Sequence, residues 1–208
     1  MAFAGELAVA DHLPWGEEAR GVVAVLLAAV TALWLTMRRG GSPADLGLVR
    51  PTRWRTVPLW VLGILILFVA AQALVPLLLA PFFDTPAPDM SRYDFIRGDA
   101  LAAIAMALLL PLTAAIPEEI VYRGFLIRQF ERLYGNARLG SIVAVLSQAL
   151  IFGSVHFQWG LGGMIMTSIM GIVWGGAYLL CGRNLWIVIL AHSTAHIALI
   201  LQLYSSPA

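Results

Sequence analysis

This chain has few charged residues. Charged residues make up 12% of its 208 residues and the net charge is +1, whereas about a quarter of the residues of a soluble domain are charged. Lysine is absent, so all 13 basic residues are arginine. A net charge this close to zero gives no reason to expect nucleic acid as a partner. One cysteine, Cys181, excludes an intrachain disulfide framework.

Apolar residues take the place of the missing charge. They make up 60% of the sequence, with a mean hydropathy of +0.84. The lipid bilayer is therefore the first expected partner. The length allows about six spans of roughly 20 residues and leaves little for a separate soluble domain. We predict an all-α, polytopic transmembrane helical bundle in a single membrane domain, residues 1–208.

Apolar runs place the individual spans. They are Gly21–Thr36, Val57–Phe82, a run that starts at Leu101, Leu139–Phe157, Leu161–Leu180 and Leu185–Tyr204. The third run continues through Pro111 and Pro117 into an amphipathic segment, Gly124–Tyr134. We expect this span to be kinked or broken near the two prolines. A break there could add a seventh crossing.

The arginines indicate the orientation of the chain. Five lie between Arg38 and Arg55, four between Arg123 and Arg138, and one in the turn that follows Cys181. The intervening loops are acidic or uncharged. Because basic loops stay in the cytoplasm, we predict that these three connections are cytoplasmic and that both termini are outside.

The segment Pro117 to Arg123 brings ionisable groups to the end of an apolar run, where they are costly and often functional. On a helix Glu119 and Arg123 stand four apart and can form a structural ion pair. Glu118 points about a quarter turn away and is free to act as a general base on water. The alternative is a solvated, charged helix end at the membrane interface.

Three histidines fall in or beside later apolar runs. His156 shares a helix face with Phe152, four residues earlier, and a lone histidine at the end of a span is more often an interfacial or core residue than a catalyst. His192 and His196 also stand four apart, the spacing by which two imidazoles reach one metal or one substrate group. Ser193 follows the first of them, so this is not the thermolysin-type metalloprotease motif. A proton-relay or packing role is the alternative.

The order Glu-Glu-x-x-x-Arg, Phe-x-x-x-His, His-x-x-x-His resembles the CAAX-protease and bacteriocin-processing (CPBP, or Abi) family of intramembrane proteases, which includes the type II CAAX prenyl endopeptidases. The resemblance covers about Leu101 to Leu201. We therefore divide the chain into residues 1–98, two N-terminal spans without a family signal, and residues 99–204, a catalytic core. The resemblance implies an endopeptidase that hydrolyses a membrane-embedded or lipid-modified peptide or protein.

The resemblance also implies roles for four residues. Glu118 and His156 would hold the attacking water, and His192 would contribute at the oxyanion or a metal. The family's last motif usually ends in asparagine, where this chain has His196; a neutral imidazole can also donate a hydrogen bond. The same four side chains could instead hold zinc or another divalent metal, with a position left open for water. A metal-free mechanism is the alternative.

Two other functions remain open at this point. The carboxylate and imidazoles could form the pathway of a proton- or metal-coupled transporter, although we find no inverted repeat. The motif could also hold the fold of a catalytically silent scaffold or immunity protein. Substrate identity, cleavage site and oligomeric state are not readable from the sequence.

Helix lengths raise one difficulty for a shared site. If the third span starts at Asp99, Glu118 lies roughly 28 Å along it, near the cytoplasm. If the fourth starts at Arg138, His156 lies roughly 27 Å further on, near the outside. A tilt, a helix break or a re-entrant Glu118–Tyr134 helix is needed to bring the two to one depth.

Overall fold

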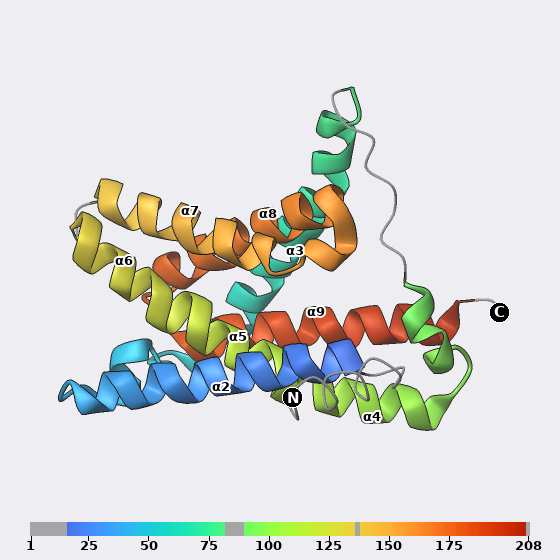
Figure 1. The fold of residues 1–208 in the computed structure, drawn as a ribbon, viewed down its shortest axis with the longest axis horizontal. Helices are drawn as coiled ribbons and strands as arrows, with labels where there is room; N and C mark the ends of the chain where they lie inside the picture. Colours follow the sequence, from blue (N-terminus) through green and yellow to red (C-terminus); the bar gives the residue numbers. More distant parts are fainter. Residues whose placement is uncertain (1–15, 82–89, 136–137, 207–208) are drawn as a thin grey trace, which may run out of the picture.

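The computed structural model describes residues 16–81, 90–135 and 138–206, and over these ranges the regular structure is helical, without a strand. The all-α prediction is confirmed. The longer single helices are α2 (Gly16–Arg38), α3 (Val57–Leu79), α7 (Arg138–Ser154), α8 (Gly160–Leu180) and α9 (Leu185–Ser205). Most of them run back and forth along the long axis of the molecule (Figure 1).

The third span is one helical run of 35 residues, Ala100–Tyr134. It consists of α4 (Ala100–Leu110), η4 (Pro111–Ala115), α5 (Ile116–Glu118), η5 (Glu119–Leu126) and α6 (Ile127–Tyr134), of which η4 and η5 are π-helical. Each proline lacks the N–H that would donate the regular i to i−4 hydrogen bond. In a wider π turn, the N–H of a later residue can donate to the carbonyl that this leaves without a partner. The helix bends between α4 and α6 (Figure 1) but does not break.

This continuity explains how Glu118 and the later histidines reach one depth. Glu118 is residue 19 of the 35-residue run, near its middle, because the helix continues to Tyr134. Our depth estimate placed it near the cytoplasmic end because it measured the rise from Asp99 along a straight span of ordinary length.

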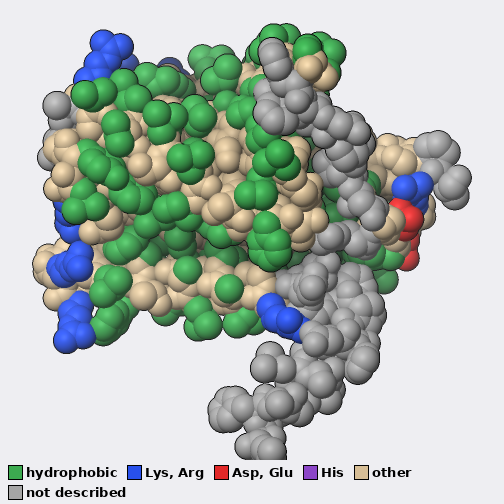
Figure 2. Space-filling model, turned by 45° about the horizontal axis from the view of Figure 1, so that its top comes forward, with side chains coloured by type: hydrophobic (Ala, Val, Ile, Leu, Met, Phe, Trp, Pro, Cys, Tyr) green, Lys and Arg blue, Asp and Glu red, His purple; other side chains and the backbone are tan. Residues whose placement is uncertain are grey.

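The molecule has the surface of a membrane protein. Five described helices are long and apolar enough to cross a bilayer, and α7, with 17 residues, is a shorter apolar helix. Large apolar side chains such as Leu77, Leu101 and Leu180 are exposed on the outside. Figure 2 shows hydrophobic side chains over the broad middle of this face, with most of the visible arginines at its left end. The chain is a multi-pass membrane protein of five to six spans.

The helices enclose a single main core that includes both N-terminal spans. Ala32 of α2 and Ile64 of α3 are buried in the same cluster as Ile120, Trp174 and Val188. The first two spans are therefore packed against the later helices.

The three arginine-bearing connections meet at one end of the bundle. Arg183 donates to both carboxylate oxygens of Glu131, at 2.9 and 2.7 Å, and Arg128 pairs with Asp45. Asn184 donates to the carbonyl oxygen of Val49. The fold thus groups these connections on one side, as predicted; that this side is the cytoplasmic one remains a prediction.

Gly47 permits one further contact between these connections. Its φ of +89° is left-handed, and its carbonyl accepts the backbone N–H of Leu185 at 2.8 Å. A Cβ at this position would collide with the carbonyl oxygen of Arg183, whereas Gly40, with a φ of +78°, has open space around it. Gly47 therefore carries a steric constraint that Gly40 lacks.

We expect Gly40→Ala to lower the free energy of unfolding by about 1 kcal/mol through its φ alone, and Gly47→Ala to cost roughly twice that or more. Thermal unfolding in detergent, followed by tryptophan fluorescence, measures both. Equal losses from the two changes would show that the Gly47 contact is unimportant.

Candidate active site

A buried ion pair lies at the centre of the molecule. Arg123 donates through Nη1 to Oε1 of Glu119 at 2.9 Å, and both side chains are fully buried. The guanidinium lies 4.7 Å from the ring centroid of Phe152. The pair has the i, i+4 relation that the sequence indicated, and it is formed within π-helical η5. Charges this deeply buried need each other, because neither is solvated.

Glu119 has a second partner on another helix. Its Oε1 is 2.8 Å from Nδ1 of His192, a residue of α9 that is 1% exposed. A carboxylate oxygen can only accept, so Nδ1 carries the proton and donates it. A neutral His192 then has its lone pair on Nε2. Glu119 thus fixes both the tautomer and the orientation of His192.

Glu118 faces the other side of the same imidazole. Its Oε2 lies 3.9 Å from Nε2 of His192, too far for a direct hydrogen bond but suited to a shared small polar group. The Glu118 side chain is 18% exposed, while Glu119 is fully buried. Of the two neighbouring carboxylates, one is therefore committed to structure and the other is accessible.

His196 extends the cluster along α9. Its ring centroid lies 4.5 Å from that of His192. Within the described part of the chain, Nε2 of His192 and Nδ1 of His196 are buried without a hydrogen-bond partner. Unpaired buried nitrogens cost about 1–3 kcal/mol each, which marks this as a place for an additional polar group.

His156 lies at the edge of the cluster. Its Nδ1 donates to the backbone carbonyl of Phe152 at 2.7 Å, so the lone pair of the neutral ring is on Nε2. The ring packs on Phe152 at 4.9 Å and on Trp159 at 4.8 Å, and Phe152 packs on Tyr122 at 4.8 Å. Among the described residues no hydrogen bond or ion pair joins His156 to Glu118.

The contacts of Glu119 and Trp174 with His192 were not expected from the sequence. We assigned Glu119 only to Arg123, because the i, i+4 rule compares residues of one helix. Trp174 is fully buried and packs edge-on against His192, with 5.6 Å between ring centroids. Nothing in the sequence distinguishes Trp174 from any other aromatic residue of an apolar span.

The four residues considered for a metal do not fit one as they are placed. Among the described residues, no group of three or more His, Cys, Asp or Glu side chains is arranged to hold an ion. We therefore derive no step through a metal.

The part of the chain that carries these residues resembles a known family. A family model described as "Type II CAAX prenyl endopeptidase Rce1-like" matches residues 100–198, which include Glu118, His156, His192 and His196. No curated protein and no solved structure matches the chain.

The buried pair makes a prediction about stability. Glu119→Gln or Arg123→Met alone leaves one buried charge unpaired, so each should lower the free energy of unfolding by about 3–5 kcal/mol. The double variant Glu119→Gln/Arg123→Met removes both charges, while the amide oxygen of the introduced glutamine can still accept from His192.

The double variant should therefore lose much less than the two single losses together, as measured by thermal unfolding in detergent. Additive losses would mean that the two side chains act independently.

Proposed function

We propose that Glu118 and His192 activate the water that attacks the peptide bond. The chain belongs to the CAAX protease (CPBP) family and is in general terms a CAAX-type intramembrane endopeptidase. The observation that carries this proposal is the 3.9 Å between Oε2 of Glu118 and Nε2 of His192. Both atoms accept hydrogen bonds when the carboxylate is ionised and the imidazole is neutral.

A water between these acceptors donates one hydrogen to each, which leaves an oxygen lone pair for the carbonyl carbon of the substrate. As the C–O bond forms, Glu118 takes a proton from the water. Glu118 then delivers it to the amide nitrogen as the C–N bond breaks. The products are a carboxylic acid and an amine, and Glu118 is again ionised.

Glu119 acts in this proposal without touching substrate. It holds Nδ1 of His192 at 2.8 Å, and its negative charge stabilises the imidazole whenever that ring gains a proton. The arrangement parallels the orienting carboxylate of a hydrolase triad. Arg123 in turn holds the Glu119 carboxylate in place through the 2.9 Å ion pair.

His196 and His156 have the remaining roles. We assign His196 to the oxyanion, because its tautomer is not fixed by a protein acceptor at Nδ1. His156 has its Nε2 as an acceptor and packs on Phe152, at the edge of the cluster. The substrate is a membrane-embedded or lipid-modified peptide, in keeping with the position of Glu118 inside an apolar span.

Cleavage of a farnesylated CAAX peptide with flanking fluorophore and quencher tests the proposal. We expect Glu118→Gln and His192→Ala to lower kcat roughly 10²- to 10⁴-fold, and His156→Ala to lower it as well. Thr194→Ala is the matched control, because this exposed α9 residue lies between the two histidines and its hydroxyl donates to the carbonyl of Leu190.

Turnover should persist in phenanthroline, since no step uses a metal. Undiminished cleavage by Glu118→Gln would overturn the assignment. Proton flux in liposomes without peptide cleavage would favour a transporter instead.

His196 makes a separate prediction. Asparagine can donate a hydrogen bond from the same helix face, so His196→Asn should retain cleavage within about tenfold, whereas His196→Ala should lose roughly 10²- to 10³-fold in kcat. The KM should change little in both. Equal activity of the two variants would remove His196 from the reaction.

A further inference from the structure

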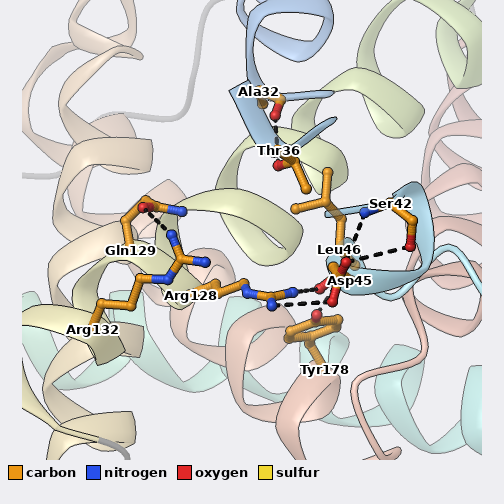
Figure 3. A network of polar contacts seen from close by, with 9 residues as sticks. All are labelled: Ala32, Thr36, Ser42, Asp45, Leu46, Arg128, Gln129, Arg132 and Tyr178. Atoms are coloured by element: carbon orange, nitrogen blue, oxygen red, sulfur yellow. Dashed lines mark hydrogen bonds and ion pairs between the residues drawn. The ribbon is translucent and has the colours of Figure 1, made fainter. Parts of the chain in front are cut away.

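A second polar site lies away from the glutamates and histidines, at the end where the arginine-bearing connections meet. A cavity of about 250 Å³ is present between the end of α2, the following connection and α6. Its polar side chains include Arg39, Arg128, Gln129, Arg132 and Asp45. Figure 3 shows Arg128, Gln129 and Arg132 on neighbouring turns, opposite Asp45 and Ser42.

Two of these arginines converge without a carboxylate. Nη1 of Arg39 and Nη1 of Arg132 both donate to Oε1 of Gln129, each at 3.2 Å. The two positive groups are therefore close together on one neutral amide oxygen. Within the described residues no ion pair compensates either of them. Like charges held this close repel, and an anion between them relieves that repulsion.

The one carboxylate of the cavity is already engaged. Asp45 accepts from the backbone N–H of Ser42 at 2.7 Å and from Nη2 of Arg128 at 3.1 Å. The Ser42 N–H and then the Arg128 guanidinium hold the pKa of Asp45 below its ordinary value. Asp45 therefore neutralises Arg128 and leaves the charges of Arg39 and Arg132 uncompensated.

The position of the cavity indicates the kind of anion. Arg39 directly follows the apolar α2, and Arg132 lies in the last turns of the 35-residue span. Leu35 and Phe125 give the cavity an apolar wall on the side of the spans. A ligand of matching chemistry has a phosphate at the membrane surface and an apolar part that extends along the helices.

We propose that this cavity binds the phosphate of an anionic phospholipid headgroup. Arg39 and Arg132 bind the phosphate oxygens, Gln129 holds the two guanidiniums in place, and the acyl chains lie along the apolar surface beside Leu35. The site does not depend on the proposed catalytic residues.

Native mass spectrometry of the detergent-solubilised protein with phosphatidylglycerol, phosphatidylcholine or glycerol 3-phosphate tests the proposal. We expect phosphatidylglycerol to bind, and Arg39→Ala/Arg132→Ala to weaken its binding roughly tenfold or more, as expected for two juxtamembrane arginines. The matched control is Arg38→Ala/Arg138→Ala, which removes the same charge from exposed neighbours at the same end of the molecule. It should change the affinity less than about twofold.

Three results would overturn the proposal. Equal losses in the two double variants would show non-specific attraction to a basic surface. Binding of glycerol 3-phosphate as tight as that of the lipid, with the same dependence on Arg39 and Arg132, would assign the site to a free phosphate compound. Displacement of the lipid by a CAAX peptide with a free C-terminal carboxylate, but not by its amide, would assign the site to the substrate.

Discussion

The buried carboxylate of Glu119 is the group on which the site depends. It binds Arg123 within its own helix at 2.9 Å and His192 of α9 at 2.8 Å. Each of these three side chains is at most 1% exposed. A charge buried to this degree is tolerated only with partners in good geometry. The interaction therefore ties the third span to the sixth and at the same time orients the imidazole that faces Glu118.

The two neighbouring glutamates differ because the helix turns between them. One residue of rotation places Glu119 in the core and leaves Glu118 partly accessible. The segment that carries them is π-helical from Glu119, and π turns recur at functional sites because they re-aim side chains without ending the helix. Pro111 and Pro117 supply the local cause, since neither can donate the regular hydrogen bond.

The two polar regions of the molecule follow different physical rules. Around His192 the polar groups are few, and the charges that are fully buried, those of Glu119 and Arg123, are paired with each other, as a low-dielectric interior requires. At the end where the arginine-bearing connections meet, the charges of Arg39 and Arg132 are exposed and of one sign, which water and a membrane surface tolerate. The first arrangement suits hydrolysis of a peptide bond, and the second suits the binding of an anion.

Composition, run lengths and motif order by themselves determined the helical membrane fold, the boundaries of most spans and the ion pair of Glu119 with Arg123. They could do so because span length and the i, i+4 relation are local properties of a helix. Only the tertiary structure decided that the third span continues through both prolines, that Glu119 also binds His192, and that Trp174 packs beside it. Two of these features are contacts between residues of different helices, and the third is the bend of one helix. Packing between helices determines all three, and the spacing of residues within one helix does not encode it.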